Sequence, residues 1–137
     1  MNWKFLGQRV GLRSVLAILP GSTWARFHLG NAYAEHGFPE RAVPEWTRAC
    51  ETATPRPAAL QNLGAARLKQ KDHAGAFAAY ERLLAIAPTD DLRLTVGVLA
   101  AALKQDARAL EILRAITDPA IRAKVQPKID ALAKKLA

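Results

Sequence analysis

Residues 26–46 read RFHLGNAYAEHGFPERAVPEW, and residues 60–80, which begin 34 positions later, read LQNLGAARLKQKDHAGAFAAY. Leu-Gly occupies the same place in both segments, and so does an alanine followed by an aromatic residue four positions on. The matched residues are Leu29, Gly30, Ala42 and Trp46 in the first segment and Leu63, Gly64, Ala76 and Tyr80 in the second. A period of this length predicts stacked helical hairpins, because a single hairpin cannot bury its apolar face alone.

Proline, glycine and potential capping residues divide the chain into five predicted segments. Val96-Gly97 follows Leu63-Gly64 by 33 positions, so a degenerate third repeat keeps the register, with the missing residue in the loop after Pro88. The predicted segments are an N-terminal helix at 1–20, repeats at 23–56, 57–89 and 90–117, and a C-terminal helix at 118–137. We expect these segments to form one domain, with both end helices covering apolar faces.

The period and its residues resemble the tetratricopeptide repeat, which carries Leu-Gly in its first helix and alanine before an aromatic residue in its second. The chain departs from the pattern where the family has Trp and Tyr around Leu-Gly. These positions hold Arg26 and Tyr33 in the first repeat, and Leu60 and Arg67 in the second. The resemblance implies an all-α, antiparallel helix-hairpin solenoid with capping helices at both ends.

Turn chemistry gives specific expectations for the helix ends. Potential N-caps are Ser22 or Thr23, Asp72, and Thr89 or Asp90. Pro44 lies inside a predicted helix, where we expect a kink or a late start. In the N-terminal helix, helical spacing predicts an inner apolar face that contains Phe5, Leu12, Val15, Leu16 and Leu19.

Composition limits the class of protein. Half of the residues are hydrophobic, but the longest apolar runs, 15–19 and 96–103, are shorter than the ~20 residues that span a bilayer. The lone Cys50 excludes an intrachain disulfide and is expected in the core. We expect a cytoplasmic protein. Attachment to the cytoplasmic face of a membrane and an N-terminal transit peptide are the alternatives.

No pattern typical of catalysis is present. His28, His36 and His73 have no Cys or carboxylate neighbours at metal-ligand spacing, and no glycine-rich phosphate loop follows a strand. We therefore predict a protein that is not an enzyme and that has no metal or cofactor.

The resemblance places a partner-binding groove along the first helix of each repeat. The implied groove residues are Trp24, Phe27, Asn31, Gln61, Asn62, Ala65, Asp91, Leu94, Thr95 and Val98. Asn31 and Asn62 match the asparagines of the subgroup that binds C-terminal carboxylates. Phe27, Asp91 and Thr95 occupy that subgroup's basic positions, so the carboxylate clamp is not expected, and the groove suits an apolar helix or extended segment.

The net charge of +8 is concentrated at the two ends, with +4 in residues 1–26 and +4 in residues 120–137. A possible N-terminal docking face holds Trp3, Leu6, Arg9, Val10 and Arg13, and a basic C-terminal face holds Lys124, Lys128, Lys134 and Lys135. The leading hypothesis is a non-catalytic adaptor that binds a protein partner as a small subunit of a larger assembly. An accessory subunit on anionic lipid headgroups is the alternative, nucleic-acid binding is a weaker one, and self-association stays open.

Overall fold

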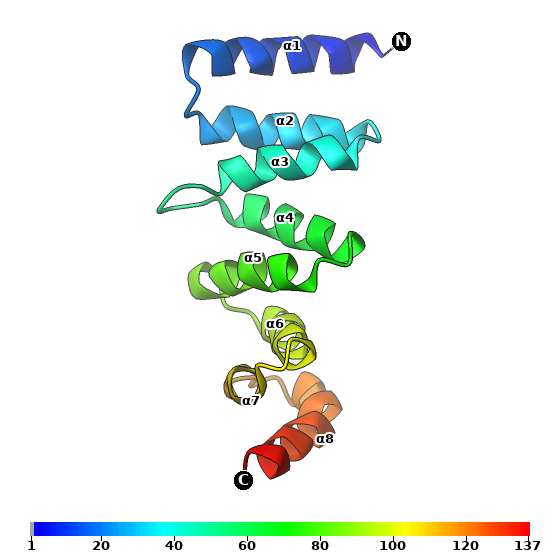
Figure 1. Cartoon of the computed structure of the whole chain (residues 1–137), viewed down its shortest axis with the longest axis vertical. Coiled ribbons are helices and arrows are strands. Elements are labelled where there is room, and N and C mark those ends of the chain that lie inside the picture. Colours follow the sequence, from blue (N-terminus) through cyan, green and yellow to red (C-terminus); the bar gives the residue numbers. More distant parts are fainter. Residues whose placement is uncertain (1) are drawn as a thin grey trace. The chain divides into compact units, whose positions relative to one another are not determined.

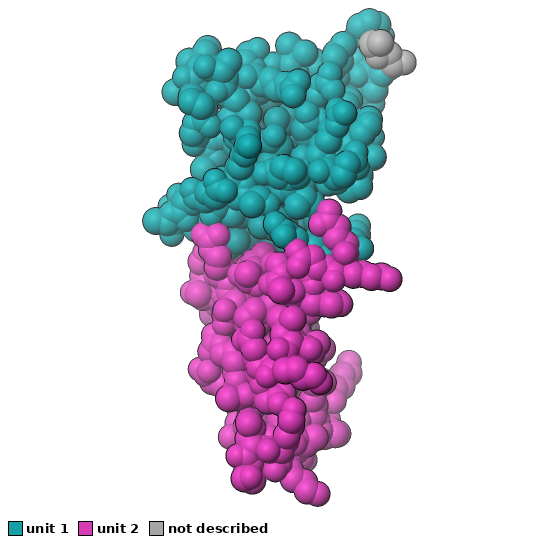
Figure 2. All heavy atoms as spheres, viewed as in Figure 1, with its two compact units in different colours: residues 1–69 teal, residues 70–137 magenta. Residues whose placement is uncertain are grey.

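The structure, a computed structural model, describes residues 2–137 and contains only helices and loops over that range (Figure 1). The chain divides into two compact units, residues 1–69 and residues 70–137 (Figure 2). Unit 1 holds α1 (Trp3–Ile18), α2 (Thr23–Glu35), α3 (Pro39–Ala49) and α4 (Pro57–Lys69); unit 2 holds α5 (His73–Ile86), α6 (Asp90–Ala102), α7 (Asp106–Arg114) and α8 (Pro119–Leu136). The all-α prediction is confirmed. None of the helices within residues 2–137 is long and apolar enough to cross a bilayer.

Side chains satisfy free backbone N–H groups at the start of most helices, and each such cap is worth about 1 kcal/mol. Ser22 and Asp72 act as predicted, and Thr89 rather than Asp90 caps α6. The capping oxygens accept from N–H groups three residues on: Asn2 from Phe5 at 3.1 Å, Ser22 from Ala25 at 3.2 Å, Asp72 from Gly75 at 2.9 Å, Thr89 from Leu92 at 3.2 Å and Asp118 from Ile121 at 2.9 Å.

In unit 1, α1 packs on α2, α2 on α3 and α3 on α4, with successive helices running in opposite directions (Figure 1). Helices α2 and α3 approach closely where Gly30 of α2 faces Trp46 of α3. A Cβ atom added at Gly30 would lie 2.5 Å from Trp46 Cδ1, a distance that real side chains do not tolerate. Gly30 is therefore required by the bulk of the aromatic residue in the second helix of the same hairpin.

An aromatic cluster joins α1 to the turn between α2 and α3. The Phe5 ring stacks on His36 with centroids 4.3 Å apart and on Phe38 at 5.7 Å. Leu12, two turns further along α1, is the buried residue of this helix. The predicted inner face is wrong at Leu19, which is 60% exposed, because α1 ends at Ile18 and the chain then turns away.

Of the two outcomes expected at Pro44, a kink or a late helix start, the late start is not seen. Helix α3 begins at Pro39, its first position, and continues through Pro44 to Ala49. Pro44 is exposed, whereas Ala42 and Trp46 on the opposite side are buried. Packing of that buried side outweighs the single backbone hydrogen bond that Pro44 removes.

In unit 2, α5 packs on α6, α6 on α7, and α8 on both α6 and α7. Gly97 of α6 faces the fully buried Leu113 of α7, which repeats the glycine contact seen in unit 1. Helix α8 buries Val125, Ile129 and Leu132, as the predicted C-terminal cap requires.

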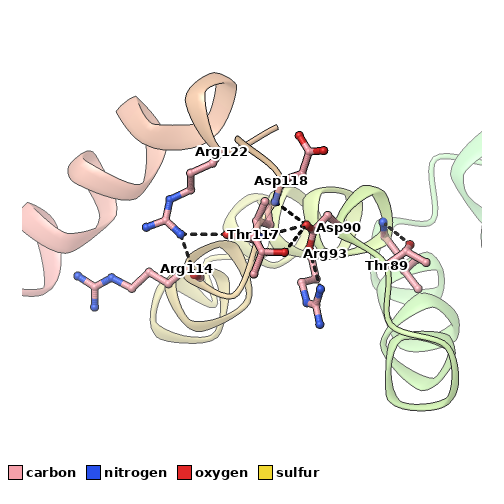
Figure 3. A network of polar contacts seen from close by, with 9 residues as sticks. Thr89, Asp90, Arg93, Arg114, Thr117, Asp118 and Arg122 are labelled. Atoms are coloured by element: carbon pink, nitrogen blue, oxygen red, sulfur yellow. Dashed lines mark hydrogen bonds and ion pairs between the residues drawn. The ribbon is translucent and has the colours of Figure 1, made fainter. Parts of the chain in front are cut away.

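A carboxylate holds the start of α6 against the link between α7 and α8 (Figure 3). Asp90 Oδ2 accepts from the Asp118 N–H at 2.7 Å, and from the N–H and the hydroxyl of Thr117, both at 3.0 Å. Asp90 Oδ1 pairs with Arg93 at 2.6 Å. These donors, the Asp118 N–H first and Arg93 second, lower the pKa of Asp90 from its ordinary 3.8 to about 2.

This network predicts a specific acid sensitivity. The pKa of Asp90 is lower in the folded chain than in the unfolded chain. The stabilisation that its carboxylate gives the fold is therefore present above about pH 4 and is lost as pH falls toward 2. We expect Asp90→Asn to lower the melting temperature by a few degrees at pH 7. The variant should also lose part of the fall in melting temperature that the original chain shows between pH 4 and pH 2. Thermal unfolding followed by circular dichroism measures both effects. Asp91→Asn, at an exposed neighbour, is the control, and equal melting of the two variants at pH 7 would refute the assignment.

Candidate partner-binding surface

Helices α2 and α4 of unit 1 carry six of the ten predicted groove residues. On α2, Trp24, Phe27 and Asn31 follow one another at helical spacing. Trp24 is 48% exposed and Asn31 is half-buried, whereas Phe27 is only 9% exposed. Phe27 therefore belongs to the packing beneath this surface and offers a partner almost no area. On α4, Gln61 is exposed and Asn62 and Ala65 are half-buried.

Hydrogen bonds join the two asparagines across α2 and α4. Asn31 Oδ1 accepts from the Asn62 amide at 3.1 Å and from the indole N–H of Trp46 at 2.9 Å. The Asn31 amide nitrogen and the Asn62 carbonyl oxygen make no hydrogen bond to any described residue of the chain. One free donor and one free acceptor therefore lie on neighbouring side chains, which is the complement of a peptide group.

An aromatic and cationic cluster lies beside these asparagines. Trp24 rests against His28 with ring centroids 4.6 Å apart, and His28 meets the edge of Phe27 at 5.1 Å. The guanidinium of Arg56 lies 5.8 Å from the centroid of the Phe27 ring, in cation–π geometry. His28 and Arg56 were not among the predicted site residues. No sequence signal identifies them, because Arg56 reaches the cluster from the loop before α4.

Unit 1 shows how the residues around the predicted carboxylate-clamp position are engaged. Phe27 stands where the clamp needs a cation, and Arg26 is already paired with Glu45 at 2.9 Å, with both side chains less than a fifth exposed. Arg56 is the exposed cation next to the Trp24 cluster. This surface can therefore supply an apolar anchor, amide hydrogen bonds and one positive charge.

The other four predicted groove residues lie on α6 of unit 2. Asp91, Leu94, Thr95 and Val98 share one face of that helix, at positions i, i+3, i+4 and i+7. Asp91 and Val98 are exposed and the other two are half-buried. The Thr95 hydroxyl donates to the Asp91 backbone oxygen at 3.1 Å, so it is already engaged within the helix.

The five residues of the predicted N-terminal docking face lie on α1. Trp3 and Val10 are 74% and 54% exposed, Arg13 is exposed, and Leu6 is half-buried. Arg9 differs from this prediction, because its guanidinium lies over the Phe5 ring at 5.7 Å and so turns toward the aromatic cluster.

The four lysines of the predicted basic face lie on α8, and one of them is paired within the chain. Lys124, Lys128 and Lys134 are exposed. Lys135 forms an ion pair with Asp106 of α7, so it contributes to the contact between α7 and α8. Sequence spacing could not reveal this pair, because its partner lies 29 residues away.

No metal centre emerges from the described residues. Within residues 2–137, no three His, Cys, Asp or Glu side chains come close enough together to hold a metal ion. Cys50 is buried, as expected for a core residue.

Comparison with known proteins agrees with this architecture. Residues 57–90 match the model of the tetratricopeptide repeat. A search of curated protein sequences finds no match. The solved structures that resemble the chain include a crystal structure of MamA (22% identity, TM-score 0.62, covering 80% of this chain and 65% of that one), a second crystal structure of MamA protein (19%, 0.64, 94% and 68%) and a MamA AMB-1 structure (16%, 0.66, 99% and 84%). At these identities the likeness concerns the fold.

Proposed function

Because the chain carries a tetratricopeptide repeat at residues 57–90 and has the all-α hairpin fold of that family, we propose that it is a non-catalytic protein–protein adaptor. The surface of α2 and α4 in unit 1 is the proposed binding site for a segment of the partner. Helical-repeat proteins use such stacked first helices as extended binding surfaces. The function lies in these side chains, since the fold alone serves many partners.

The observation that carries the proposal is the asparagine pair. The free amide donor of Asn31 and the free carbonyl of Asn62 complement the C=O and N–H of one peptide unit. An extended partner segment exposes such groups, whereas a helix uses them internally. Trp24, exposed on the same helix as Asn31, supplies an aromatic anchor for an apolar side chain of that segment.

Peptide selection tests this proposal directly. Random twelve-residue peptides displayed on phage are selected against the full chain, and the enriched peptides are measured by fluorescence anisotropy. We expect Trp24→Ala to weaken their binding about tenfold or more, which corresponds to about 1.4 kcal/mol for one exposed anchor. Asn62→Ala should weaken the same peptides, because it removes the free carbonyl oxygen.

Ile86→Ala is the matched control, because Ile86 is as exposed as Trp24 but lies on α5. It should leave the affinity unchanged. If the selected peptides bind Trp24→Ala and Asn62→Ala as tightly as the original chain, the α2–α4 surface is not the binding site.

A further inference from the structure

Helix α1 has two apolar faces, and unit 1 covers only one of them. Phe5 and Leu12 face the turn after α2 and the core, while Trp3, Val10 and Ile18 are 74%, 54% and 80% exposed on the opposite side. In Figure 1, α2 lies along one side of α1, and no other helix of unit 1 lies along its other side. Trp3, Val10 and Ile18 lie seven and eight residues apart, with Gly7, Gly11 and Ser14 between them on the same side. Exposed apolar side chains gathered on one side of a helix favour an interaction site there.

Two glycines leave the middle of this outer face with little side-chain bulk. Gly7 and Gly11 lie one turn apart between Trp3 and Ile18, and a Cβ atom at either glycine would meet nothing within 4 Å. Mid-helix glycine lowers helix stability, and no close contact within the described chain requires it here. Glycine at such positions allows the backbone of another helix to approach closely. We call the low stretch at Gly7 and Gly11, between the bulky Trp3 and Ile18, the saddle of the outer face.

Positive charges lie on both flanks of this saddle. Helical spacing places Lys4 on one side of the Trp3–Val10 line and Arg13 on the other, and both are exposed. Neither forms an ion pair with another residue in the described range 2–137. The first acidic residue of the chain is Glu35, so α1 has no negative charge of its own.

We propose that this outer face of α1 docks an amphipathic helix of a partner protein whose apolar stripe is flanked by Asp or Glu. The saddle accepts a crossing helix, and the acidic flanks complement Lys4 and Arg13. A second copy of α1 would instead bring like charges together. An anionic bilayer would use the charges, but it would need bulky apolar side chains where Gly7 and Gly11 stand.

The test compares two synthetic eighteen-residue helices with the same Leu and Ala stripe, one flanked by Glu and one by Lys. Calorimetry on the full chain should show binding of the Glu-flanked helix at least tenfold tighter than that of the Lys-flanked helix. Gly7→Leu should fill the saddle and weaken this binding at least tenfold. Its melting temperature should not fall, since nothing lies within 4 Å of the new side chain's first atom. Arg13→Glu should reduce the preference for the Glu-flanked helix to less than threefold, because the two flanks then carry opposite charges.

Trp24→Ala is the control that separates this site from the α2–α4 surface, and it should leave binding of the Glu-flanked helix unchanged. No binding of that helix at 100 µM, equal affinity for both helices, or full affinity in Gly7→Leu would each overturn the proposal. So would binding of the chain to anionic phosphatidylglycerol vesicles that persists in Gly7→Leu, or dimerisation through α1 seen by sedimentation and abolished by that variant.

Discussion

Replacing Trp46 with alanine is expected to lower the free energy of unfolding by about 3–5 kcal/mol. Trp46 is only 7% exposed, and its ring fills the space that Gly30 leaves between α2 and α3. Because the neighbouring backbone is held by two helices, it can collapse only partly into the resulting cavity. Urea unfolding followed by circular dichroism measures the loss, which should appear as a lower midpoint with a similar slope.

Two further variants divide the loss at this position. Trp46→Phe keeps a six-membered aromatic ring but removes the five-membered ring of the indole, with the atoms that lie against Gly30 and the N–H that donates to Asn31 at 2.9 Å. It should cost about 1–2 kcal/mol, less than the alanine variant. Gly30→Ala should destabilise the original chain and be tolerated beside Trp46→Ala, since the clashing ring is then absent. A loss below about 1 kcal/mol for Trp46→Ala would show that this contact is not central to unit 1.

The hairpin boundaries could be predicted from the sequence because local chemistry determines them. Pro57 opens α4, Asp72 caps α5 and Asp118 caps α8, each by an interaction within one helical turn. The repeat period then identifies which residues meet across a hairpin. Gly30 and Trp46 are such a pair, and their close contact explains why this hairpin carries glycine opposite a bulky aromatic residue.

The structure differs from the sequence predictions where contacts between residues far apart in the chain compete with local conformational preference. Pro44 should interrupt a helix in isolation, but the buried Ala42 and Trp46 stabilise α3 through it. Leu19 has the spacing of a core residue, yet α1 ends before it. Lys135 pairs with a residue of another helix that is distant in sequence. None of these outcomes follows from a window of neighbouring residues.

The candidate site was predictable only as a set of positions. Helical spacing correctly brings Trp24 and Asn31 to one side of α2. Helical spacing does not determine how deeply a side chain is buried. Phe27 was therefore expected to be accessible, whereas it is buried. Spacing also does not determine hydrogen bonding. That Asn31 accepts from both Trp46 and Asn62, and so leaves one donor and one acceptor free, depends on the distances among three helices.

Gly97→Val is expected to destabilise the chain by about 3 kcal/mol through overpacking in unit 2. A Cβ atom at Gly97 would lie 2.6 Å from Leu113 Cγ, and Leu113 is fully buried between its neighbours. Valine adds two further methyl groups to this contact, so either the Leu113 rotamer or the separation of α6 and α7 must change. Urea unfolding of the variant measures the loss.

The matched control is Gly11→Ala in α1, where an added Cβ atom meets nothing within 4 Å. That change should raise the free energy of unfolding by up to about 1 kcal/mol, because alanine favours a helix over glycine. Opposite signs at two mid-helix glycines would show that contact distance, rather than helix propensity, determines the cost at Gly97. Leu113→Ala should reduce the additional effect of Gly97→Val, because it removes the atoms that clash. If Gly97→Val were tolerated in the original chain, α6 and α7 could not be packed as closely as the structure shows, and the repeated glycine would need another explanation.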